Sequence, residues 1–340
     1  MQIELPISKS IANRLLILQA IHGDGLMPVS VAMPDDVQIL YQSLKACEQQ
    51  GDNDIILNIG NCGTAARFLT AYLAQRINQV VVLDGVERMH HRPIGQLVEA
   101  LREIGAQIEY LGEEGFPPLR IKGCVLDKHR IVRIDNPVST QFVSALLLIG
   151  ANVQTNSSSP YISITREIIQ YYTILHNATP YYTIEKDWSS AAFWYEHVAL
   201  HGGEICFPGL FRDSLQGDKV VADIFAYLGV QTLYTAGGVV IKPIASVSKI
   251  LSLDFGNCPD LYPAVAITCE RLGIELQATG TESLSIKESD RLRAIHEHRT
   301  DHDHRMAMAL LVAGYEVDDT DCIAKSYPQF MEQWQIIQNS

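Results

Sequence analysis

Apolar residues that recur every three or four positions predict the first helix of this chain. In the stretch Ser10–Ile21, the side chains of Ile11, Leu15 and Leu18 fall on one face of such a helix. The serine at its start can cap the first turn, and Gly23 is a typical residue for its end. We therefore expect an amphipathic helix here.

A second periodic stretch, Pro93–Ile104, places Leu97 and Leu101 on one apolar face. Proline at the start and Gly105 after the end are typical limits of a helix. The apolar run Val80–Leu83, which comes before it, predicts a buried strand.

The same spacing recurs along the rest of the chain, with short β-like runs in between. An alternation of helices and strands indicates an α/β fold. The further helices predicted in this way are Gln141–Gly150, Ser189–Leu200, Val220–Leu228, Tyr262–Leu272 and Arg305–Val312.

Two pairs of segments resemble each other. SIANRLLILQAIHG (Ser10–Gly23) is similar to SSAAFWYEHVALHG (Ser189–Gly202), and LREIGAQIEY (Leu101–Tyr110) is similar to FAYLGVQTLY (Phe225–Tyr234). Two halves built from one repeating unit would explain both pairs, although helices that end in His-Gly or Leu-Gly also occur by chance. The repeat places the boundary between the halves near Glu185.

Composition narrows the class of protein. The chain has 340 residues, of which 47% are hydrophobic and 19% charged, as in folded proteins of two domains or one large one. Its net charge of −13 disfavours nucleic acid or an anionic membrane as the partner. With no secretory leader or membrane-spanning run, we expect a cytoplasmic protein with its seven scattered cysteines reduced.

Basic side chains gather at expected helix starts in the first half of the chain. Lys9, Ser10 and Arg14 lie at a loop-to-helix junction, where free backbone amides favour anions. GNCGTAARFL brings two glycines and Arg67 to the mouth of another helix, and GVERMHHRPIG adds Arg88. Neither is a Walker loop or a dinucleotide fingerprint, and each alone also fits a solvated helix end.

Three more charged motifs follow late in the chain. IKESDRL carries Lys287, Glu288 and Arg291, DHRMAM carries His304 and Arg305, and AKSYPQF carries Lys325. The nearby histidines lack the spacing of a zinc site, so a polar connecting segment is the simpler interpretation of His296, His298 and His302.

Taken in order from Leu5 to Phe330, these motifs resemble the enolpyruvyl transferase family, and within it the members that act on shikimate 3-phosphate. The family's L-P-G-S-K-S-x-S-N-R stands here as LPISKSIANR, its G-N-A-G-T as GNCGT and its E-P-R-M-x-x-R-P as VERMHHRP. Its S-S-Q-F stands as STQF, K-P-Y-I-x-I-T as SPYISIT and D-x-S-S-A as DWSSA. Its K-E-T-D-R-L stands as KESDRL, its P-D as CPD, and D-H-R-M-A-M is unchanged.

The resemblance implies an enzyme that transfers the enolpyruvyl group of phosphoenolpyruvate to the 5-hydroxyl of shikimate 3-phosphate and releases phosphate. This reaction belongs to the shikimate pathway of aromatic amino acid biosynthesis and needs no metal and no cofactor. The implied fold is two similar domains of repeated βαβαββ-type units, an inside-out α/β barrel, with the active site in the cleft between them. The lobes would be residues 8–185, on the shikimate 3-phosphate side, and residues 1–7 with 186–340, on the phosphoenolpyruvate side; the protein would be a monomer.

The resemblance also carries site residues over, motif by motif. Those implied for shikimate 3-phosphate are Lys9, Ser10, Arg14, Ser139, Thr140, Ser158, Tyr161, Asp260 and Lys287. Those implied for phosphoenolpyruvate are Lys9, Gly63, Arg88, Gln141, Arg291, Arg305 and Lys325. Guanidinium groups grip carboxylates and phosphates through paired hydrogen bonds, which suits two anionic substrates.

Asp260 is the implied base that takes the proton of the attacking hydroxyl, and Glu288 the group that moves protons at the methylene carbon, with His304 and Lys9 assisting. Without the family, Asp260 would be read as part of a Pro-Asp turn before a helix. Glu288 would be read as a first-turn carboxylate that complements a helix dipole.

Several positions depart from the family pattern, namely Cys62, Thr140, Ser159 and Ser283. Length departs more: only Arg293–Asp303 separates KESDRL from DHRM, where the family has a further strand and helix, and Cys47–Ile59 and Tyr171–Ile184 are short too. Either the protein is a reduced member, or loops near Gly51 and Arg299 are missing from the printed chain.

Two rival functions remain open at this point. The sister enzyme that transfers enolpyruvyl to a UDP-linked amino sugar shares the implied fold but lacks the VERM and DHRMAM sequence motifs. A catalytically inactive protein that keeps the anion site but cannot close is the rival from another class.

Overall fold

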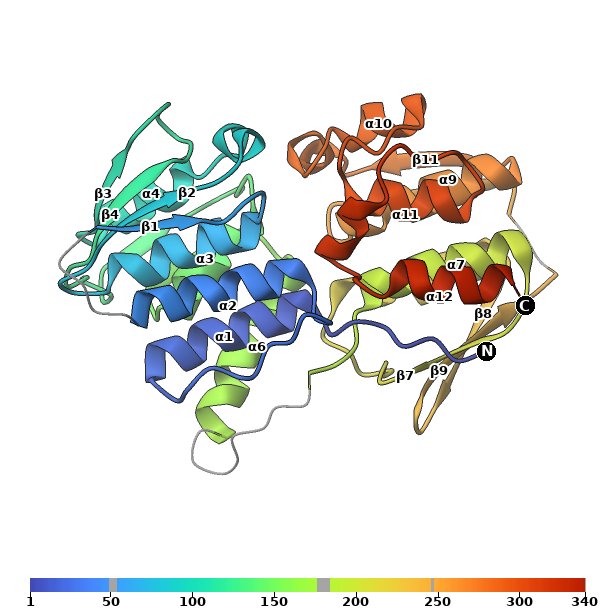
Figure 1. The fold of residues 1–340 in the computed structure, drawn as a ribbon, viewed down its shortest axis with the longest axis horizontal. Coiled ribbons are helices and arrows are strands. Elements are labelled where there is room, and N and C mark those ends of the chain that lie inside the picture. The colour runs from blue at the N-terminus through green and yellow to red at the C-terminus, as the bar shows by residue number, and fades with distance from the viewer. Residues whose placement is uncertain (49–53, 176–183, 246–247, 340) are drawn as a thin grey trace. The chain divides into compact units, whose positions relative to one another are not determined.

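The computed structural model describes residues 1–48, 54–175, 184–245 and 248–339. The chain divides into two compact units, each with its own helices and sheets (Figure 1). Unit 1 consists of Met1–Lys9, Val31–Asp35 and Thr183–Ser340, and unit 2 of Ser10–Ser30 and Asp36–Tyr182.

Unit 2 is a mixture of helices and short strands. Its helices, the first two of which each begin with one residue of unit 1, are α1 (Lys9–His22), α2 (Asp35–Glu48), α3 (Gly63–Ala74), the 3-10 helix η1 (Glu87–His91), α4 (Gly95–Glu103), α5 (Thr140–Leu148) and α6 (Pro160–Leu175). Its strands are β1 (Ile55–Asn58), β2 (Val80–Asp84), β3 (Gln107–Tyr110), β4 (Leu119–Lys122), β5 (Ile131–Arg133) and β6 (Asn152–Gln154).

The main sheet of unit 2 has the strand order β1-β2-β4-β3. β1 and β2 are parallel, whereas β4 pairs antiparallel with both of its neighbours. A second, two-stranded sheet joins β5 and β6 in parallel. Parallel pairs need a crossover, and the helix α3 lies between β1 and β2 in the chain and packs on this sheet.

The interior of unit 2 is helical. Every residue of α1 from Ile11 to Leu18 is buried, and in α3 only Thr64 is not. Helices that are buried on all faces must lie inside a domain rather than on its surface. α3 packs against α4 and α5, and α5 packs against α6.

Unit 1 repeats this kind of organisation. Its helices are α7 (Trp188–His201), η2 (Gly217–Val220), α8 (Val221–Tyr227), η3 (Pro259–Leu261), α9 (Tyr262–Leu272), η4 (Glu282–Ile286), α10 (Arg291–Glu297), α11 (His304–Val312), η5 (Asp321–Lys325) and α12 (Phe330–Gln338). Its strands are β7 (Ile205–Pro208), β8 (Val230–Thr235), β9 (Gly238–Pro243), β10 (Ile250–Asp254) and β11 (Glu275–Thr279).

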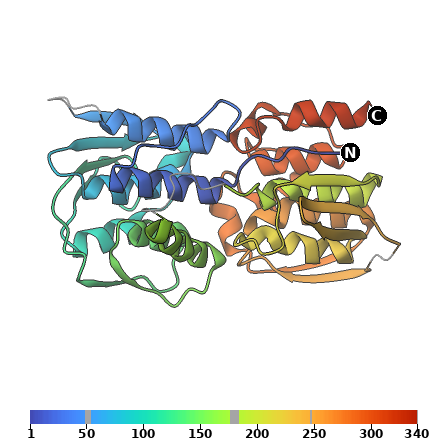
Figure 2. The same ribbon diagram turned by 90° about the horizontal axis from the view of Figure 1, so that it is seen from below.

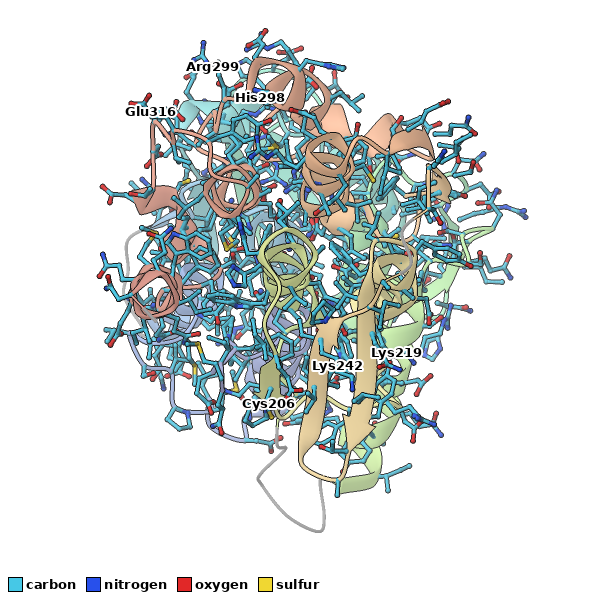
Figure 3. All side chains as sticks on the ribbon, turned by 90° about the vertical axis from the view of Figure 1, so that its right-hand side faces the viewer. Cys206, Lys219, Lys242, His298, Arg299 and Glu316 are labelled. Carbon is cyan, nitrogen blue, oxygen red and sulfur yellow. The ribbon has the colours of Figure 1, made fainter. Side chains whose placement is uncertain are left out.

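The larger sheet of unit 1 is antiparallel, in the order β7-β9-β8, and β10 pairs in parallel with β11. Figure 3 views this unit along α7 and labels Cys206 on β7 and Lys242 on the neighbouring β9. The first residues of the chain lie along β7, where Gln2 bridges to Cys206.

The core of unit 1 is built on three helices, α7, α9 and α11, that pack on one another. Every side chain of α7 from Trp188 to Glu196 is buried. α12 runs beside α7 (Figures 1 and 2), and there the ring of Trp194 lies 5.2 Å from that of Phe330. This aromatic contact joins the end of the chain to the central helix.

The predicted helices and the predicted strand are all present, with ends that shift by a few residues. α4 begins at Gly95 rather than Pro93, because the carbonyl of Pro93 accepts a bond from Arg67 (2.6 Å) and the amide of Ile94 donates to Gly115 (2.8 Å). The capping role of Ser10 was wrong, since α1 already begins at Lys9.

The similar segments adopt the same local structure. Gly23 and Gly202 follow α1 and α7 with φ of 75° and 80°. Gly105 and Gly229 separate α4 from β3 and α8 from β8, with φ of 101° and 89°. A positive φ is the conformation that favours glycine, so these four turns explain the shared Gly in the sequences.

Within the ranges given above, no helix is long and apolar enough to cross a membrane. All seven cysteines are free thiols, as expected. The site of the proposed break near Gly51, and part of Tyr171–Ile184, lie outside the described residues. The connection at Arg299 is described and compact: the Arg299 amide donates to the Ala294 carbonyl at 3.0 Å.

Glu196 is an exception in the core of unit 1. It is fully buried in α7, and neither of its carboxylate oxygens has a hydrogen-bond partner among the described residues. Burial therefore raises the pKa of Glu196 well above its ordinary value. The raised pKa favours the protonated carboxyl in the folded protein over a pH range in which the unfolded chain is ionised.

We therefore expect Glu196→Met to raise the free energy of unfolding by about 1–3 kcal/mol near neutral pH. Because the folded pKa is raised, wild-type stability should fall as the pH rises above the ordinary value for Glu, and the gain from Met should grow accordingly. Denaturant unfolding between pH 4.5 and 8 measures this. The exposed Glu103→Met is the control, and equal gains for both variants at every pH would contradict the prediction.

Candidate active site

A buried arginine organises the charged residues of unit 1. Arg291 is the first residue of α10, which Asp290 caps, and its side chain has no exposed surface. Its Nε donates to Asp303 (2.7 Å), its Nη1 to Asp260 (3.0 Å) and its Nη2 to Glu288 (3.0 Å). One guanidinium thus holds three carboxylates from three segments.

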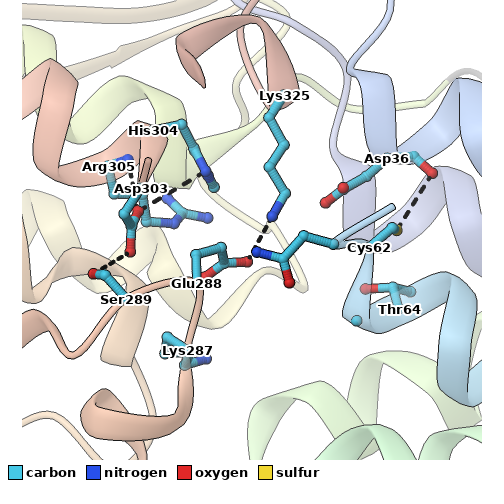
Figure 4. A network of polar contacts seen from close by, with 12 residues as sticks. Asp36, Cys62, Thr64, Lys287, Glu288, Ser289, Asp303, His304, Arg305 and Lys325 are labelled. Carbon is cyan, nitrogen blue, oxygen red and sulfur yellow. Dashed lines mark hydrogen bonds and ion pairs between the residues drawn. The ribbon is translucent and has the colours of Figure 1, made fainter. Parts of the chain in front are cut away.

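Asp303 ties two helix starts together. It caps α11 by accepting from the backbone amide of Arg305 (2.9 Å), and it also accepts from Ser289 (3.2 Å) and Arg291. Figure 4 shows Asp303 pointing toward Ser289 from the start of α11. Because Asp303 is fully buried, the DHRM and KESDRL motifs are held against each other by charges that water does not screen.

Asp260 lies in η3, immediately before α9, and meets three cations. Besides Arg291, it contacts Nη2 of Arg305 at 2.8 Å and Nζ of Lys287 at 3.5 Å. Burial alone would raise the pKa of Asp260, but Arg305, Lys287 and Arg291 lower it well below its ordinary value. Asp260 is an ionised carboxylate in this state.

Glu288 lies outside helix α10, three residues before its first residue, so it is not the first-turn carboxylate considered above. Lys325 at the end of η5 points toward it, with 3.2 Å between Nζ and a carboxylate oxygen (Figure 4). Glu288 therefore lies between the cations Lys325 and Arg291.

His304 begins α11 and is 1% exposed. Neither ring nitrogen has a hydrogen-bond partner among the described residues. Burial, followed by the charges of Lys9 and Arg305, lowers the pKa of His304 well below its ordinary value. The lowered pKa favours a neutral imidazole, which lies near Lys9 and has its Nδ1 3.9 Å from a carboxylate oxygen of Asp303 (Figure 4).

Two carboxylates near this group were missed from the sequence. Asp218, in η2, accepts a hydrogen bond from Ser189 and is 2% exposed. Burial, then the negative charge of Asp260, raises the pKa of Asp218 to about 6. Asp187 caps α7. The only sequence signal for Asp218 was an acid two residues before the apolar start of a predicted helix.

Unit 2 contains a buried arginine of a different kind. Arg14 is 3% exposed and donates to Thr165 Oγ1 (2.7 Å), Ser144 Oγ (3.2 Å) and the carbonyls of Ser10 and Tyr161. No carboxylate of the described residues forms an ion pair with it. Burial lowers the pKa of Arg14 to about 10, so an anion beside it would be stabilised.

The start of α3 is crowded by two more guanidinium groups. A Cβ added at Gly63 would lie 2.5 Å from Nη2 of Arg92 and 2.9 Å from Nη1 of Arg67. A larger residue here would have to displace the ends of these two side chains. Cys62 caps this helix by accepting from the Ala65 amide, and its thiol points toward the Asp36 carbonyl (Figure 4). Arg92 was missed from the sequence, although VERMHHRP contains it.

The other predicted residues of unit 2 lie at the starts of elements. Ser139 caps α5, which begins at Thr140, and Gln141 donates to Thr64 at the start of α3 (3.0 Å). Arg88 lies in η1, Ser158 precedes α6, and Tyr161 is in the first turn of α6.

Each unit thus gathers its own share of the predicted residues. Unit 1 brings together Lys9, Asp260, Lys287, Glu288, Arg291, His304, Arg305 and Lys325. Ser10, Arg14, Gly63, Arg88, Ser139, Thr140, Gln141, Ser158 and Tyr161 belong to unit 2.

The histidines of the segment from His296 to His304 have separate surroundings. Over the described part of the chain, no three His, Cys, Asp or Glu side chains are placed to hold a metal ion. His298 contacts Glu270 (2.9 Å) and His302 contacts Asp319 (2.6 Å), which makes them separate surface pairs.

Several known proteins similar to this chain carry the same name. A protein from Bacteroides fragilis, 3-phosphoshikimate 1-carboxyvinyltransferase, is 36% identical over 390 positions, covering 97% of this chain and 93% of the relative. The protein of the same name from Colwellia psychrerythraea is 29% identical, covering 98% and 95%. The solved structure of EPSP synthase from Acinetobacter baumannii has a TM-score of 0.68 at 19% identity, covering 99% and 95%, which shows the fold.

The alignment also locates the missing length. Its 390 positions contain 97% of 340 residues, about 330, so about 60 positions are filled by the Bacteroides fragilis protein alone. The sequence model of the EPSP synthase (3-phosphoshikimate 1-carboxyvinyltransferase) family matches residues 29–298 and 296–334 as two pieces. The pieces meet between KESDRL and DHRM, where a strand and helix were expected to be absent.

The family model covers most of the chain, and the Bacteroides fragilis relative exceeds 30% identity over nearly all of it. The charged motifs from GNCGT in unit 2 to Lys325 in unit 1 lie within the matched residues, whereas the motif with Lys9 and Arg14 precedes them. The chain therefore belongs to the EPSP synthase (3-phosphoshikimate 1-carboxyvinyltransferase) family.

Proposed function

We propose that this protein is a 3-phosphoshikimate 1-carboxyvinyltransferase. It transfers the enolpyruvyl group of phosphoenolpyruvate to the 5-hydroxyl of shikimate 3-phosphate and releases phosphate, a step of aromatic amino acid biosynthesis. The observation that carries this proposal is the cluster in unit 1, where Asp260 and Glu288 are surrounded by Lys287, Arg291, Arg305 and Lys325. Carboxylates able to move protons lie among cations able to hold two anions.

The ligands divide as the family motifs indicate. Shikimate 3-phosphate contacts Lys9, Asp260 and Lys287 of unit 1. The unit 2 residues implied for this substrate are Ser10, Arg14, Ser139, Thr140, Ser158 and Tyr161. Among them, Arg14 is the buried cation with which no carboxylate of the described residues forms an ion pair. Phosphoenolpyruvate contacts Lys9, Arg291, Arg305 and Lys325, with Gly63, Arg88 and Gln141 from unit 2. Residues 8–185 would then form the shikimate 3-phosphate lobe, and residues 1–7 with 186–340 the phosphoenolpyruvate lobe.

Asp260 is proposed as the base for the 5-hydroxyl. In the ligand-free state its three cations make it a weak base, because they favour the ionised form. When a substrate phosphate or carboxylate takes over Arg305 or Lys287, the positive charge beside Asp260 is neutralised. Its affinity for a proton then rises at the moment when the hydroxyl is in place.

Glu288 is proposed to move protons at the methylene carbon of phosphoenolpyruvate. Its contact with Lys325 gives the proton a second carrier, and the neutral ring of His304 is a further donor or acceptor nearby. The reaction proceeds with no metal and no cofactor, because protein cations neutralise both substrates.

The remaining parts of the proposal concern the whole molecule. We infer an inside-out α/β barrel of repeated βαβαββ-type units in each half, supported by the interior helices and by the matching turns at Gly105 and Gly229. The reacting groups meet in the cleft between the two halves. The protein works as a monomer in the cytoplasm.

Phosphate release with both substrates tests the function directly. Wild-type protein should release phosphate only when shikimate 3-phosphate and phosphoenolpyruvate are both present. Lys9→Ala should lower kcat/KM about 10- to 100-fold, the effect of losing one hydrogen bond to a charged group.

The exposed Lys249→Ala is the control for Lys9→Ala and should retain wild-type turnover. If the wild-type protein binds both substrates but releases no phosphate, it is the inactive binding protein considered above rather than an enzyme.

The two carboxylates should affect turnover more than binding. We expect Asp260→Asn and Glu288→Gln each to lower kcat about 100- to 10,000-fold. The dissociation constant of shikimate 3-phosphate, measured by calorimetry, should change less than about tenfold, since its cations remain. Glu297→Gln, at the exposed end of α10, serves as the control. Variants that lose binding and turnover in equal measure would show that these carboxylates only support the site.

A further inference from the structure

Tyr327 lies two residues after Lys325 and is fully buried. Its hydroxyl accepts from the indole N–H of Trp194 at 3.2 Å. The hydroxyl proton is shared between the Glu4 carbonyl at 3.1 Å and the side-chain oxygen of Gln333 at 2.9 Å. Gln333 in turn donates to the same Glu4 carbonyl at 2.9 Å. The Glu4 carbonyl therefore accepts hydrogen bonds from two side chains late in the sequence, Tyr327 and Gln333.

The ring of Tyr327 is held independently of its hydroxyl. It packs edge-on against Phe330, with 5.4 Å between the ring centroids, and against Trp194 at 6.5 Å. Burial raises the pKa of Tyr327 above its ordinary value, so the hydroxyl keeps its proton at any pH at which the enzyme works. Removing the oxygen alone would leave the apolar packing in place.

On the other side of this contact, the chain from Glu4 to Lys9 is tightly held. The Pro6 carbonyl accepts from the Asp187 amide and the Ser8 amide donates to the Glu185 carbonyl, both at 2.9 Å. Ile7 bridges to Lys186 between them. The Tyr327 hydroxyl therefore holds the start of this stretch at Glu4, and the bonds to residues 185–187 hold the rest of it up to Lys9.

The segment that carries Lys325 is anchored at Tyr327. The Tyr327 amide donates to the Ile323 carbonyl at 3.0 Å, which closes the turn after η5, and Phe330 continues into α12. Lys325 itself reaches Glu288 at 3.2 Å. The hydroxyl of Tyr327 thus connects the Lys9 segment to the Lys325 segment, although the two lysines are at opposite ends of the sequence.

We propose that the Tyr327 hydroxyl is a positioning group that sets Lys9 relative to Lys325, so that both ammonium groups meet the phosphoenolpyruvate anion. This inference rests on the proposed function, in which both lysines contact that substrate and only Lys9 contacts shikimate 3-phosphate. Tyr327 acts through Lys9 and Lys325 and touches neither substrate.

The test is Tyr327→Phe in the full chain, assayed by phosphate release. Loss of the bond to the Glu4 carbonyl should raise the KM for phosphoenolpyruvate about 3- to 10-fold, while the KM for shikimate 3-phosphate changes less than about twofold. The variant also removes the contacts of the hydroxyl with Trp194 and Gln333, so its thermal stability should fall as well. The control is Tyr195→Phe, which removes another buried hydroxyl of unit 1, bonded to Thr232 at 2.9 Å, and should leave both KM values unchanged.

The outcomes separate this inference from the proposed function. Equal effects of Tyr327→Phe on both substrates, or effects no larger than those of Tyr195→Phe, would overturn the positioning role. A third variant, Lys325→Ala, tests the site itself. If it raises the KM for phosphoenolpyruvate while Tyr327→Phe does not, only the inference fails. If Lys325→Ala leaves that KM unchanged, the assignment of Lys325 in the proposed function fails as well.

Discussion

The buried guanidinium of Arg291 is the interaction on which the charged cluster of unit 1 depends. Three carboxylates from separate segments, Asp260, Glu288 and Asp303, converge on it within 3.0 Å. Removing one partner of a buried ion pair leaves the other charge uncompensated and is strongly destabilising, so each of these groups supports the others. The consequence is structural as well as chemical: the starts of α10 and α11 and the turn before α9 are fixed in one arrangement, and that arrangement places Lys287, Arg305 and Lys325 around the same carboxylates.

The contacts that hold Asp260 in this network also make it a poor base. The cations that hold Asp260 in place also keep it ionised and weakly basic, and they are the groups that the family motifs assign to anionic ligands. In the proposed function, substrate binding exchanges one anion for another at Arg305 and Lys287. Binding energy realised in that exchange would make the carboxylate of Asp260 more reactive, which is the kind of coupling that accelerates a reaction rather than only tightening binding. Asp218, whose pKa of about 6 depends first on burial and then on Asp260, responds to the same change of charge.

The sequence predicted where the helices lie, as in α9, whose predicted and observed ends coincide, although every residue of α9 from Pro263 to Cys269 is buried and its burial is not limited to one face. It failed where distant contacts decide. Ser10 does not cap α1, since the bonds of Ile7 and Ser8 to the segment before α7 bring the chain directly into the helix at Lys9. Periodicity could not identify the chemistry of Asp260 or Glu288, which read as ordinary helix-end acids; the family motifs did. Asp303, Asp218 and Arg92 were overlooked as partners because their roles exist only when segments far apart in sequence meet.

The buried arginines of the two units have different partners, and this difference affects how an anion can bind beside them. In unit 1, Arg305 and Arg291 are matched by internal carboxylates, so an incoming anion must compete with Asp260 or Glu288. In unit 2, Arg14 is surrounded by hydroxyl and carbonyl oxygens alone, so an anion that reaches it displaces no charge and is opposed only by its own loss of hydration. Cations paired with carboxylates, as in unit 1, can adjust the reactivity of those carboxylates, whereas an unpaired buried cation, as in unit 2, can supply affinity for an anion. A protein that must both bind and activate anionic metabolites needs both kinds of cation, and in this chain they lie in different units.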